Sequence, residues 1–425
     1  MMTGKVDNRT KFGWSLFYLF SFLCVYLFSR GISSISLAGS IVLLGTSLFM
    51  PKAVVFQLII AISPLGNLYK ISGLTIAPFL IVIYIIKVLI CSKTSLVSKD
   101  TAIKMLLAGI LFIMSLLSSF VDGFSLVPVV SFFLHLFFLM IVLSNDESNG
   151  EDYQAYIWLF IASSLLVCFS TVIFPSISRQ LGRAISIYST ANSGFSTTWD
   201  FGRLLCISIA LLIVNYLEIR RWLVLHVGLI LVFIYFIIQC GRFSILLGLF
   251  ALLLCVPFAY GNRKQGRHYK LTYTILMLLA MIIVFVLAYR FVYPAMTSLR
   301  GVEASDNGRF DIWRSYLSLF SSNIKVLLFG VGGGAISEIA SKLGIPTAHN
   351  IILEKIIEFG IFGTILLLSL LGLMYRGRSF NIARNPRLLP LIAFIGTSLT
   401  QGTTSCLYFP ILLAICFPQI YEQEE

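Results

Sequence analysis

Runs of about 20 apolar residues recur along most of the chain, and this repetition restricts the fold more than any other feature. Each run is long enough to cross the roughly 30 Å hydrocarbon layer of a membrane as an α-helix. Hydrophobic residues make up 58% of the 425 residues and charged residues 12%, which is too apolar for a soluble domain of this length. The sequence therefore predicts an all-α polytopic membrane protein.

The apolar runs predict about 12 to 14 membrane helices. They cover residues 12–29, 32–50, 53–69, 74–91, 104–120, 126–143, 155–174, 203–217, 222–239, 243–260, 271–293, 351–375, 389–403 and 405–420. Lys5, Arg9 and Lys11 precede the first run, and no small-residue cleavage site follows it. We therefore expect the first run to be a retained membrane helix and not a removed signal peptide.

The net charge is +13 at pH 7, and the basic short loops include residues 218–221, 261–270 and 376–387. If the N-terminus is cytoplasmic, these three loops lie on the cytoplasmic side, as the positive-inside rule requires. The same orientation puts both termini in the cytoplasm and the longer segments 175–203 and 294–350 on the outer face. The charge therefore indicates orientation in a membrane and not a nucleic-acid partner.

Segment 294–350 is the longest predicted loop, and a loop of this length in a compact protein is usually functional or disordered. Its stretch GRFDIWRSYLSLF has apolar residues at a helical spacing, namely Phe310, Trp313, Leu317 and Phe320. We expect an amphipathic helix with this apolar face. The whole segment is predicted to fold over the outer mouth of a single transmembrane domain, residues 1–425.

Arginine is the main basic residue on the predicted outer side. Arginine binds phosphate oxygens through two parallel N–H groups and stays charged in a low dielectric, so a cluster at this boundary predicts a diphosphate site. Arg242 begins a helix, where the helix dipole disfavours a cation, and this position predicts a compensating anion. The alternative is that individual arginines pair with acidic residues such as Asp311 or extend to the lipid–water interface.

One of the four histidines, His349, lies at the outer end of a predicted helix. His135 and His226 lie inside apolar runs, where packing or a hydrogen bond between helices accounts for them. His268 lies in a basic inner loop. His349 is therefore the histidine in position for acid–base chemistry at the outer face.

The stretch HNIILEKIIEFG, residues 349–360, carries polar residues into an apolar helix. A helix that starts here brings Asn350, Glu354 and Glu358 onto one face, and Lys355 within reach of Glu358. A carboxylate inside a membrane needs a partner or water. Glu358 has two interpretations: it holds an arginine or His349 in place, or it pairs with Lys355 in a structural role.

The glycine-rich stretch FGVGGGAISE, residues 329–338, also has two interpretations. Its backbone amides can form an anion-binding nest, or its glycines can let the segment fold tightly over the bundle. It lacks a nucleotide-binding fingerprint, because no strand precedes it in a βαβ unit and no lysine followed by serine or threonine comes after it. The eight cysteines show no metal-binding spacing, so we predict neither zinc nor a disulfide framework.

Three stretches together, GRFDIWRSYLSLF, LLFGVGGGAISE and HNIILEKIIEFGIFG, resemble the O-antigen ligase and polysaccharide polymerase superfamily of bacterial membranes. The shared features are a long late loop, His-Asn at its end, and a following helix with Glu and Gly. QCGRFSILLGLF is similar to the family's Ser-Arg helix start, with Cys240 and Gly241 where a serine is usual. GRAISIYSTANSGF resembles the upstream arginine segment, and the similarity covers about residues 180–365.

The resemblance implies a GT-C-like helical fold in the bacterial inner membrane, with the active site on the periplasmic face. It implies a glycosyltransferase that uses an undecaprenyl-diphosphate-linked glycan, with no cofactor and no metal. His349 then acts as the base toward an acceptor hydroxyl, and Arg183 and Arg242 neutralise the leaving diphosphate. The candidate substrate-binding residues are Arg179, Arg309, Arg314, Asn350 and Glu358.

The implied partners are the lipid-linked glycan, the bilayer, a chain-length regulator and a flippase. We favour a polymerase of repeat units for O-antigen, capsule or exopolysaccharide, because the outer loop is modest and no periplasmic domain is appended. A ligase that moves finished glycan onto lipid A core or protein is the first alternative. A flippase or transporter is the second, but it needs basic residues along a path through the bundle, and the predicted charges gather at the outer face.

Overall fold

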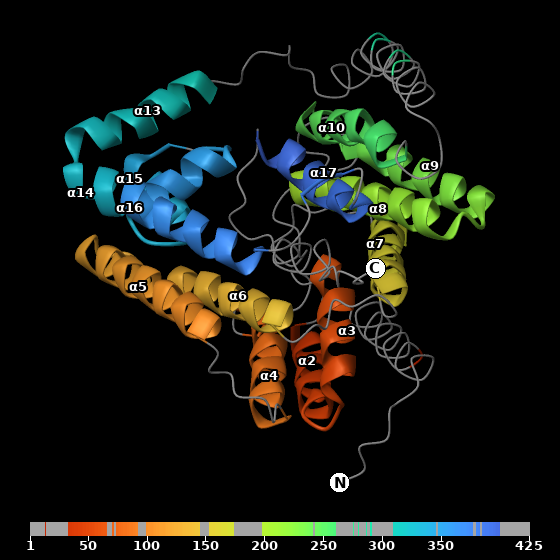
Figure 1. Cartoon of the computed structure of the whole chain (residues 1–425), viewed down its shortest axis with the longest axis horizontal. Coiled ribbons are helices and arrows are strands. Elements are labelled where there is room, and N and C mark those ends of the chain that lie inside the picture. Colours follow the sequence, from red (N-terminus) through yellow and green to blue (C-terminus); the bar gives the residue numbers. More distant parts are fainter. Residues whose placement is uncertain are drawn as a thin grey trace.

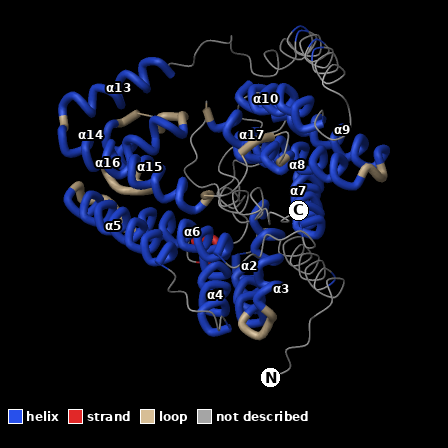
Figure 2. Tube along the Cα trace, viewed as in Figure 1, coloured by secondary structure: helices blue, strands red, loops and turns tan. Residues whose placement is uncertain are grey.

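The computed structural model describes residues 13, 33–65, 70–71, 74–91, 99–144, 153–173, 198–240, 243–260, 275, 279, 286, 290, 309–345, 347–376, 380–382 and 385–399. Within these residues the chain is almost entirely helical (Figure 2). The exception is a small antiparallel hairpin of β1 (Lys70–Ile71) and β2 (Leu74–Thr75). The predicted helical class is therefore confirmed for the described residues.

The helices follow one another with short connections in the first half of the chain. They are α2 (Ser33–Ser47), α3 (Lys52–Ile62), α4 (Ile76–Cys91), α5 (Lys99–Val121), α6 (Val127–Ser144) and α7 (Tyr153–Ile173). The second half has α8 (Thr198–Ile219), α9 (Leu223–Cys240), α10 (Phe243–Tyr260), α13 (Arg309–Ser322), α14 (Ile324–Phe329), α15 (Ile336–Leu343), α16 (Ile351–Met374) and α17 (Leu389–Ser398). Two 3₁₀ turns, η1 (Ser63–Leu65) and η4 (Pro386–Leu388), complete the description.

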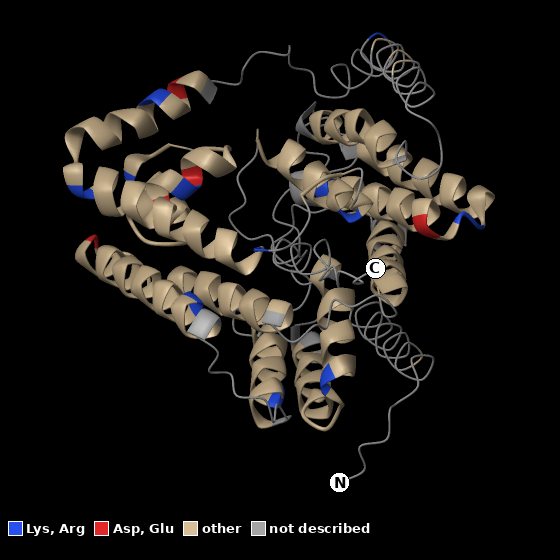
Figure 3. Ribbon diagram, in the orientation of Figure 1, with Lys and Arg blue, Asp and Glu red and all other residues tan. Residues whose placement is uncertain are grey.

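Two groups of helices make up the bundle (Figure 1). In one group α17 packs against α8 and α10, and α8 also packs against α9. In the other, α5 packs against α6 and α16. Helices α3, α4 and α7 connect the groups, because α3 contacts α4 and α7, α4 contacts α6, and α7 contacts α8. One apolar core extends through both groups, and charged side chains are sparse along their helices (Figure 3).

Three of the described helical segments are long and apolar enough to cross a membrane: Thr101–Val121, Phe201–Ile219 and Ile351–Met374. Seven shorter apolar segments accompany them. Large apolar side chains are exposed on these helices, for example Val224 on α9 and Phe120 on α5, as expected for surfaces in contact with lipid. The chain is therefore an integral membrane protein.

Most predicted helix positions agree closely with the structure, but one is wrong. The predicted helix 53–69 ends early, because α3 stops at Ile62 and continues only as the 3₁₀ turn η1. Pro64 explains the stop, since it has no backbone N–H to donate to Ile60 O, and the Ser63 hydroxyl donates to that oxygen at 2.8 Å. The 11 residues of α3 span only about 17 Å, too short to cross the hydrocarbon layer alone. The predicted helices 12–29, 271–293 and 405–420 lie outside the described residues, apart from isolated positions.

Residues 309–350 form a separate layer of short helices on the bundle, which we call the lobe. It comprises α13, α14, α15 and the segment that leads into α16 (Figure 1). Its helix α14 packs against α16 and α5, and α15 packs against α16. A second apolar cluster lies inside the lobe and includes Tyr316, Val326, Ile336 and Ala348, all of them buried.

The helix expected in GRFDIWRSYLSLF is present as α13, but its buried face differs from the prediction. Tyr316 is fully buried, whereas Phe310 and Leu317 are 65% and 55% exposed. Trp313 and Phe320 are half-buried, so the buried face is rotated toward Tyr316. The sequence period predicted the helix correctly and its orientation only in part.

Candidate functional site

The start of α16 is fixed by Asn350, the residue directly before the helix. The Asn350 side-chain oxygen accepts hydrogen bonds from the backbone N–H groups of Ile352 at 3.0 Å and Leu353 at 3.1 Å. A capping side chain of this kind satisfies donors that have no partner inside the helix. Asn350, predicted to bind substrate, is thus used by the fold as a helix cap.

His349 lies immediately before that cap and has an unusual backbone conformation. Its φ angle is +51°, in the left-handed region that non-glycine residues rarely adopt. This conformation costs about 1–2 kcal/mol for an L-residue. Such positions persist only where the surrounding structure holds them, and they are common at functional sites. The imidazole is half-buried at the mouth of α16.

Two neighbours contact the His349 region. Nδ1 of His349 lies 3.3 Å from the hydroxyl oxygen of Thr347. If Nδ1 carries the proton and donates it to this hydroxyl, Nε2 keeps a lone pair that can accept a proton. From α13, the indole N–H of Trp313 donates to the backbone oxygen of Ala348 at 2.7 Å. Thr347 therefore contacts the side chain of His349, and Trp313 holds the backbone just before it.

The two glutamates of α16 are buried on one face, as their spacing predicted. Glu354 is 0% exposed and Glu358 is 1% exposed. Lys355 Nζ donates to Glu358 Oε2 at 2.5 Å, which is the predicted pair three residues apart. Of the two interpretations of Glu358, the pair with Lys355 is therefore present. Burial, followed by the charge of Glu354, raises the pKa of Tyr316 in α13 to about 12, so this phenol is protonated at neutral pH.

A break in α16 follows Glu358. Gly360 has φ 63° and ψ −174°, which are not helical values, and the helix is kinked there. A break leaves carbonyl groups without partners inside the helix, and in a membrane these must be satisfied by another element. The backbone N–H of Val331 donates to Ile357 O at 3.0 Å, and that of Gly332 donates to Glu358 O at 2.8 Å. The glycine-rich turn of the lobe therefore completes the broken helix.

This result favours the second of the two interpretations of the glycine-rich stretch, that its glycines allow tight folding. The amides of Val331 and Gly332 are used by carbonyls of α16, so these two amides do not form an anion-binding nest. The carbonyls of the turn are held as well, because Ser118 Oγ donates to Gly330 O at 2.5 Å and Ser119 Oγ to Val331 O at 3.1 Å. The glycines allow tight folding against α5 and α16, as the second interpretation expected.

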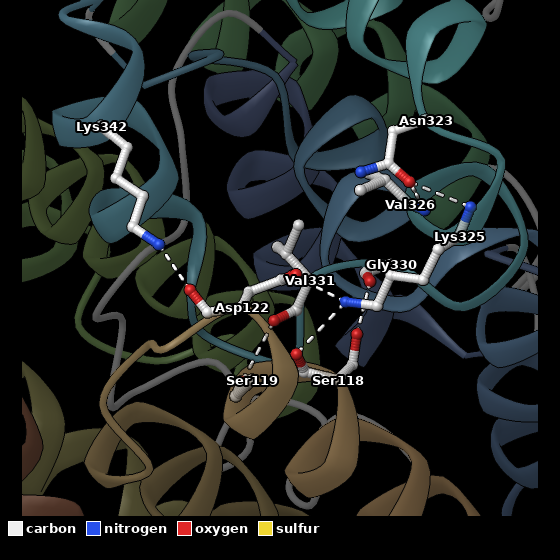
Figure 4. A network of polar contacts seen from close by, with 9 residues as sticks. All are labelled: Ser118, Ser119, Asp122, Asn323, Lys325, Val326, Gly330, Val331 and Lys342. Carbon is white, nitrogen blue, oxygen red and sulfur yellow. Dashed lines mark hydrogen bonds and ion pairs between the residues drawn. The ribbon is translucent and has the colours of Figure 1, made fainter.

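The turn after α5 is clamped to the lobe by charged side chains (Figure 4). Lys325 Nζ lies 2.6 Å from Asp122 Oδ2 and donates to Ser118 O at 3.2 Å. Lys342 donates to the backbone oxygen of Asp122. Glu338 accepts from the backbone N–H of Ser125 at 2.7 Å. The lobe is thus attached to the bundle by the clamp as well as by the glycine-rich turn.

The predicted arginines divide into described and undescribed positions. Arg314 is on α13 with an 84% exposed side chain, and its Nη1 lies 4.0 Å from Asp311 Oδ1. Arg309 is the first residue of α13. Arg179, Arg183 and Arg242 lie outside the described residues. The structure therefore places His349 and Asn350 at the start of α16 and Glu358 two turns further along it, and gives no position for the two arginines predicted to be catalytic.

Arg203 is the last residue of the predicted outer segment 175–203, but the structure places it inside a helix. It is fully buried in α8, and its guanidinium carbon lies 5.4 Å from the centre of the Phe394 ring in α17. His226 behaves as predicted, because its Nε2 lies 2.8 Å from Asn215 Oδ1 on the neighbouring helix α8. Among the described residues, no group of three His, Cys, Asp or Glu side chains is arranged to hold a metal ion.

Trp313 and Thr347 were not predicted as site residues. Trp313 contributes to the apolar period of α13, and its hydrogen bond joins residues 35 apart in the chain. A sequence pattern gives no signal for a contact of this kind. Thr347 precedes His349 by two residues, so its hydroxyl is close to the imidazole along the chain. That local spacing is a signal by which Thr347 could have been found.

A comparison with protein families gives one match. The family model described as O-antigen ligase matches residues 227–368, a range that includes most of α9, α10, the lobe and most of α16. Neither a curated protein nor a solved structure matches the chain. The matched range contains His349, the clamped glycine-rich turn and the broken helix. Residues 227–368 are therefore similar to the O-antigen ligase family, in agreement with the resemblance of the motifs.

Proposed function

We propose that the protein is a glycosyltransferase that joins oligosaccharide repeat units carried on undecaprenyl diphosphate, at the outer face of the bacterial inner membrane. The observation that carries this proposal is the left-handed, half-buried His349 at the mouth of α16, within the family-matched range. The basic inner loops support an orientation with both termini cytoplasmic and the lobe outside. The helical architecture supports a GT-C-like fold.

The reaction requires one proton transfer and one displacement. Nε2 of His349 takes the proton of the acceptor hydroxyl while its oxygen attacks the anomeric carbon of the donor sugar. The bond from that carbon to the diphosphate oxygen breaks with inversion, and the electron pair leaves with the lipid diphosphate. The imidazolium then returns its proton to solvent. No metal or cofactor takes part in this proposal, because the sugar–phosphate bond is already activated.

In this mechanism the guanidinium groups of arginines neutralise the negative charge of the leaving diphosphate. Arg183 and Arg242 are the proposed partners, and Arg179, Arg309 and Arg314 are proposed to help bind the diphosphate or glycan. We expect Arg242→Lys to lower activity about 100-fold, because an ammonium group lacks the two parallel donors of the guanidinium. Arg376→Lys, at an exposed position in a basic inner loop, is the matched control and should stay within about twofold of wild type. Full activity of Arg242→Lys would indicate that Arg242 only anchors its helix at the lipid–water interface.

Thr347 supports the proton-accepting form of His349. Thr347→Val keeps the shape of the side chain but removes the hydroxyl that contacts Nδ1. Because a hydrogen bond of this type contributes about 0.5–1.5 kcal/mol, we expect the turnover number to fall about three- to tenfold. Thr347→Ser keeps the hydroxyl and should retain most activity. Equal activity of the valine and serine variants would contradict this role of Thr347.

A ligase is the second candidate, because the matching family is described as O-antigen ligase. The deciding experiment incubates the purified protein with a defined undecaprenyl-diphosphate-linked repeat unit, with and without a lipid A core acceptor. A polymerase produces a ladder of products from the donor alone. A ligase produces a single transfer product, and only when the acceptor is present. If neither product forms with the active lipid-linked donor, the proposed glycosyl transfer is wrong.

A further inference from the structure

The backbone on the N-terminal side of His349 is held by a side chain from α13. The indole N–H of Trp313 donates to Ala348 O at 2.7 Å. This carbonyl belongs to the same planar peptide unit as the backbone nitrogen of His349. The hydrogen bond therefore restrains the orientation of that unit, and with it the φ rotation that sets the direction of the Cα–Cβ bond of His349. Ala348 itself is fully buried in the apolar cluster of the lobe.

The backbone on the other side of His349 is held by α16. The Asn350 side chain caps the helix, and its backbone oxygen accepts from Glu354 N at 2.9 Å. His349 thus lies between two fixed peptide units with φ +51°. Without an external hold, a non-glycine residue returns to negative φ, because the left-handed conformation crowds its Cβ. A rotation of that kind carries the imidazole away from its present direction.

We propose that Trp313 is a positioning residue for His349: its indole N–H keeps the Ala348–His349 peptide unit turned so that the imidazole faces the reacting groups. The proposal rests on the proposed function of His349 as the base. Trp313 acts on the backbone of His349 and not on substrate. In this proposal α13, which carries Trp313, helps to orient the proposed catalytic base.

The rest of the lobe does not depend on this hydrogen bond. Tyr316 lies three residues after Trp313 in α13 and is the fully buried side chain that anchors this helix. The half-buried Trp313 ring also contacts Phe310 in the same helix, with ring centres 5.6 Å apart. The clamp of Lys325 and Lys342 to Asp122 attaches α14 and α15 separately. Loss of the indole N–H alone should therefore leave the lobe folded and attached.

The test replaces Trp313 with phenylalanine in the full-length protein and measures steady-state kinetics with a defined undecaprenyl-diphosphate-linked repeat unit. We expect kcat to fall about tenfold, equivalent to about 1.4 kcal/mol of transition-state stabilisation, and KM to stay within about twofold. Benzothienylalanine at position 313 is a second variant, because it keeps the bicyclic ring and removes only the N–H donor. It should lower kcat by the same factor even if Trp313→Phe folds poorly.

Lys342→Gln is the matched control, since it removes a lobe contact that does not involve the Ala348–His349 peptide unit. We expect its kcat to stay within about twofold of wild type. The proposal is overturned if the benzothienylalanine protein keeps wild-type kcat, if KM rises while kcat is unchanged, or if Lys342→Gln lowers kcat equally. His349→Ala is measured in parallel. If His349→Ala is active, the proposed function itself is wrong. If His349→Ala is inactive and the Trp313 variants are fully active, only the positioning role is wrong.

Discussion

Replacement of His349 with alanine is expected to abolish glycan products while the amount of protein in the membrane stays near the wild-type level. General-base catalysis contributes about 10²–10⁴-fold, and loss of that factor should take the proposed glycosyl transfer below detection. The side chain is half-buried at the mouth of α16 and outside both apolar clusters, so its removal should cost little stability. The measurements are a gel of lipid-linked products and an immunoblot of the membrane fraction.

His349→Asn serves as the control for backbone effects. Asparagine tolerates the left-handed conformation better than most residues, so it keeps the backbone while removing the base. We expect this variant to accumulate normally and to be as inactive as His349→Ala. A product ladder from either variant would exclude His349 as the base, whatever the position of the arginines.

Gly360→Ala is expected to have the largest effect on folding. A Cβ at Gly360 would lie 2.5 Å from Leu328 C and O and from Gly330 N, atoms of a backbone that cannot withdraw. The backbone angles φ 63° and ψ −174° fall in a region that is essentially restricted to glycine. Strain of about 1–3 kcal/mol and overpacking of about 1–3 kcal/mol add to a loss of about 2–6 kcal/mol. Thermal unfolding in detergent and membrane accumulation both measure this loss.

Gly372→Ala in the same helix is the matched control. A Cβ there meets no atom within 4 Å, and the position is helical. Alanine is favoured over glycine in a helix by about 0.5–1 kcal/mol, so this variant should be neutral or more stable. Equal stability of the two variants would mean that α16 is continuous at Gly360 in the membrane.

Local patterns predicted much of the fold. The length of an apolar run largely determines where a membrane helix lies, and α10 has the same limits, 243–260, as its prediction. Helical spacing predicted that Glu354 and Glu358 share a buried face and that Lys355 pairs with Glu358. These features depend on residues no more than four positions apart, which a sequence pattern records directly.

Features that depend on distant segments were not predicted. The stretch EFGIFG is compatible with a continuous helix, and the break at Gly360 exists because residues 328–332 supply replacement hydrogen bonds. The buried face of α13 depends on where the lobe cluster lies, and this turned the helix toward Tyr316. In the site, His349 was chosen for its place at the predicted outer end of a helix, and its role as the base stays a prediction. Trp313 was not predicted, since its partner lies 35 residues away. The roles of Arg183 and Arg242 stay predictions.

The hydrogen bonds between the glycine-rich turn and the broken helix α16 restrict how far the lobe can move to admit a substrate. To lift the lobe, the protein would have to part the hydrogen bonds from Val331 and Gly332 and leave two carbonyl groups of a membrane helix without donors. Each carbonyl exposed to hydrocarbon costs several kcal/mol, so a state in which the lobe is lifted is populated only rarely. We therefore expect the lobe to stay attached to α16 during catalysis and not to open as a lid.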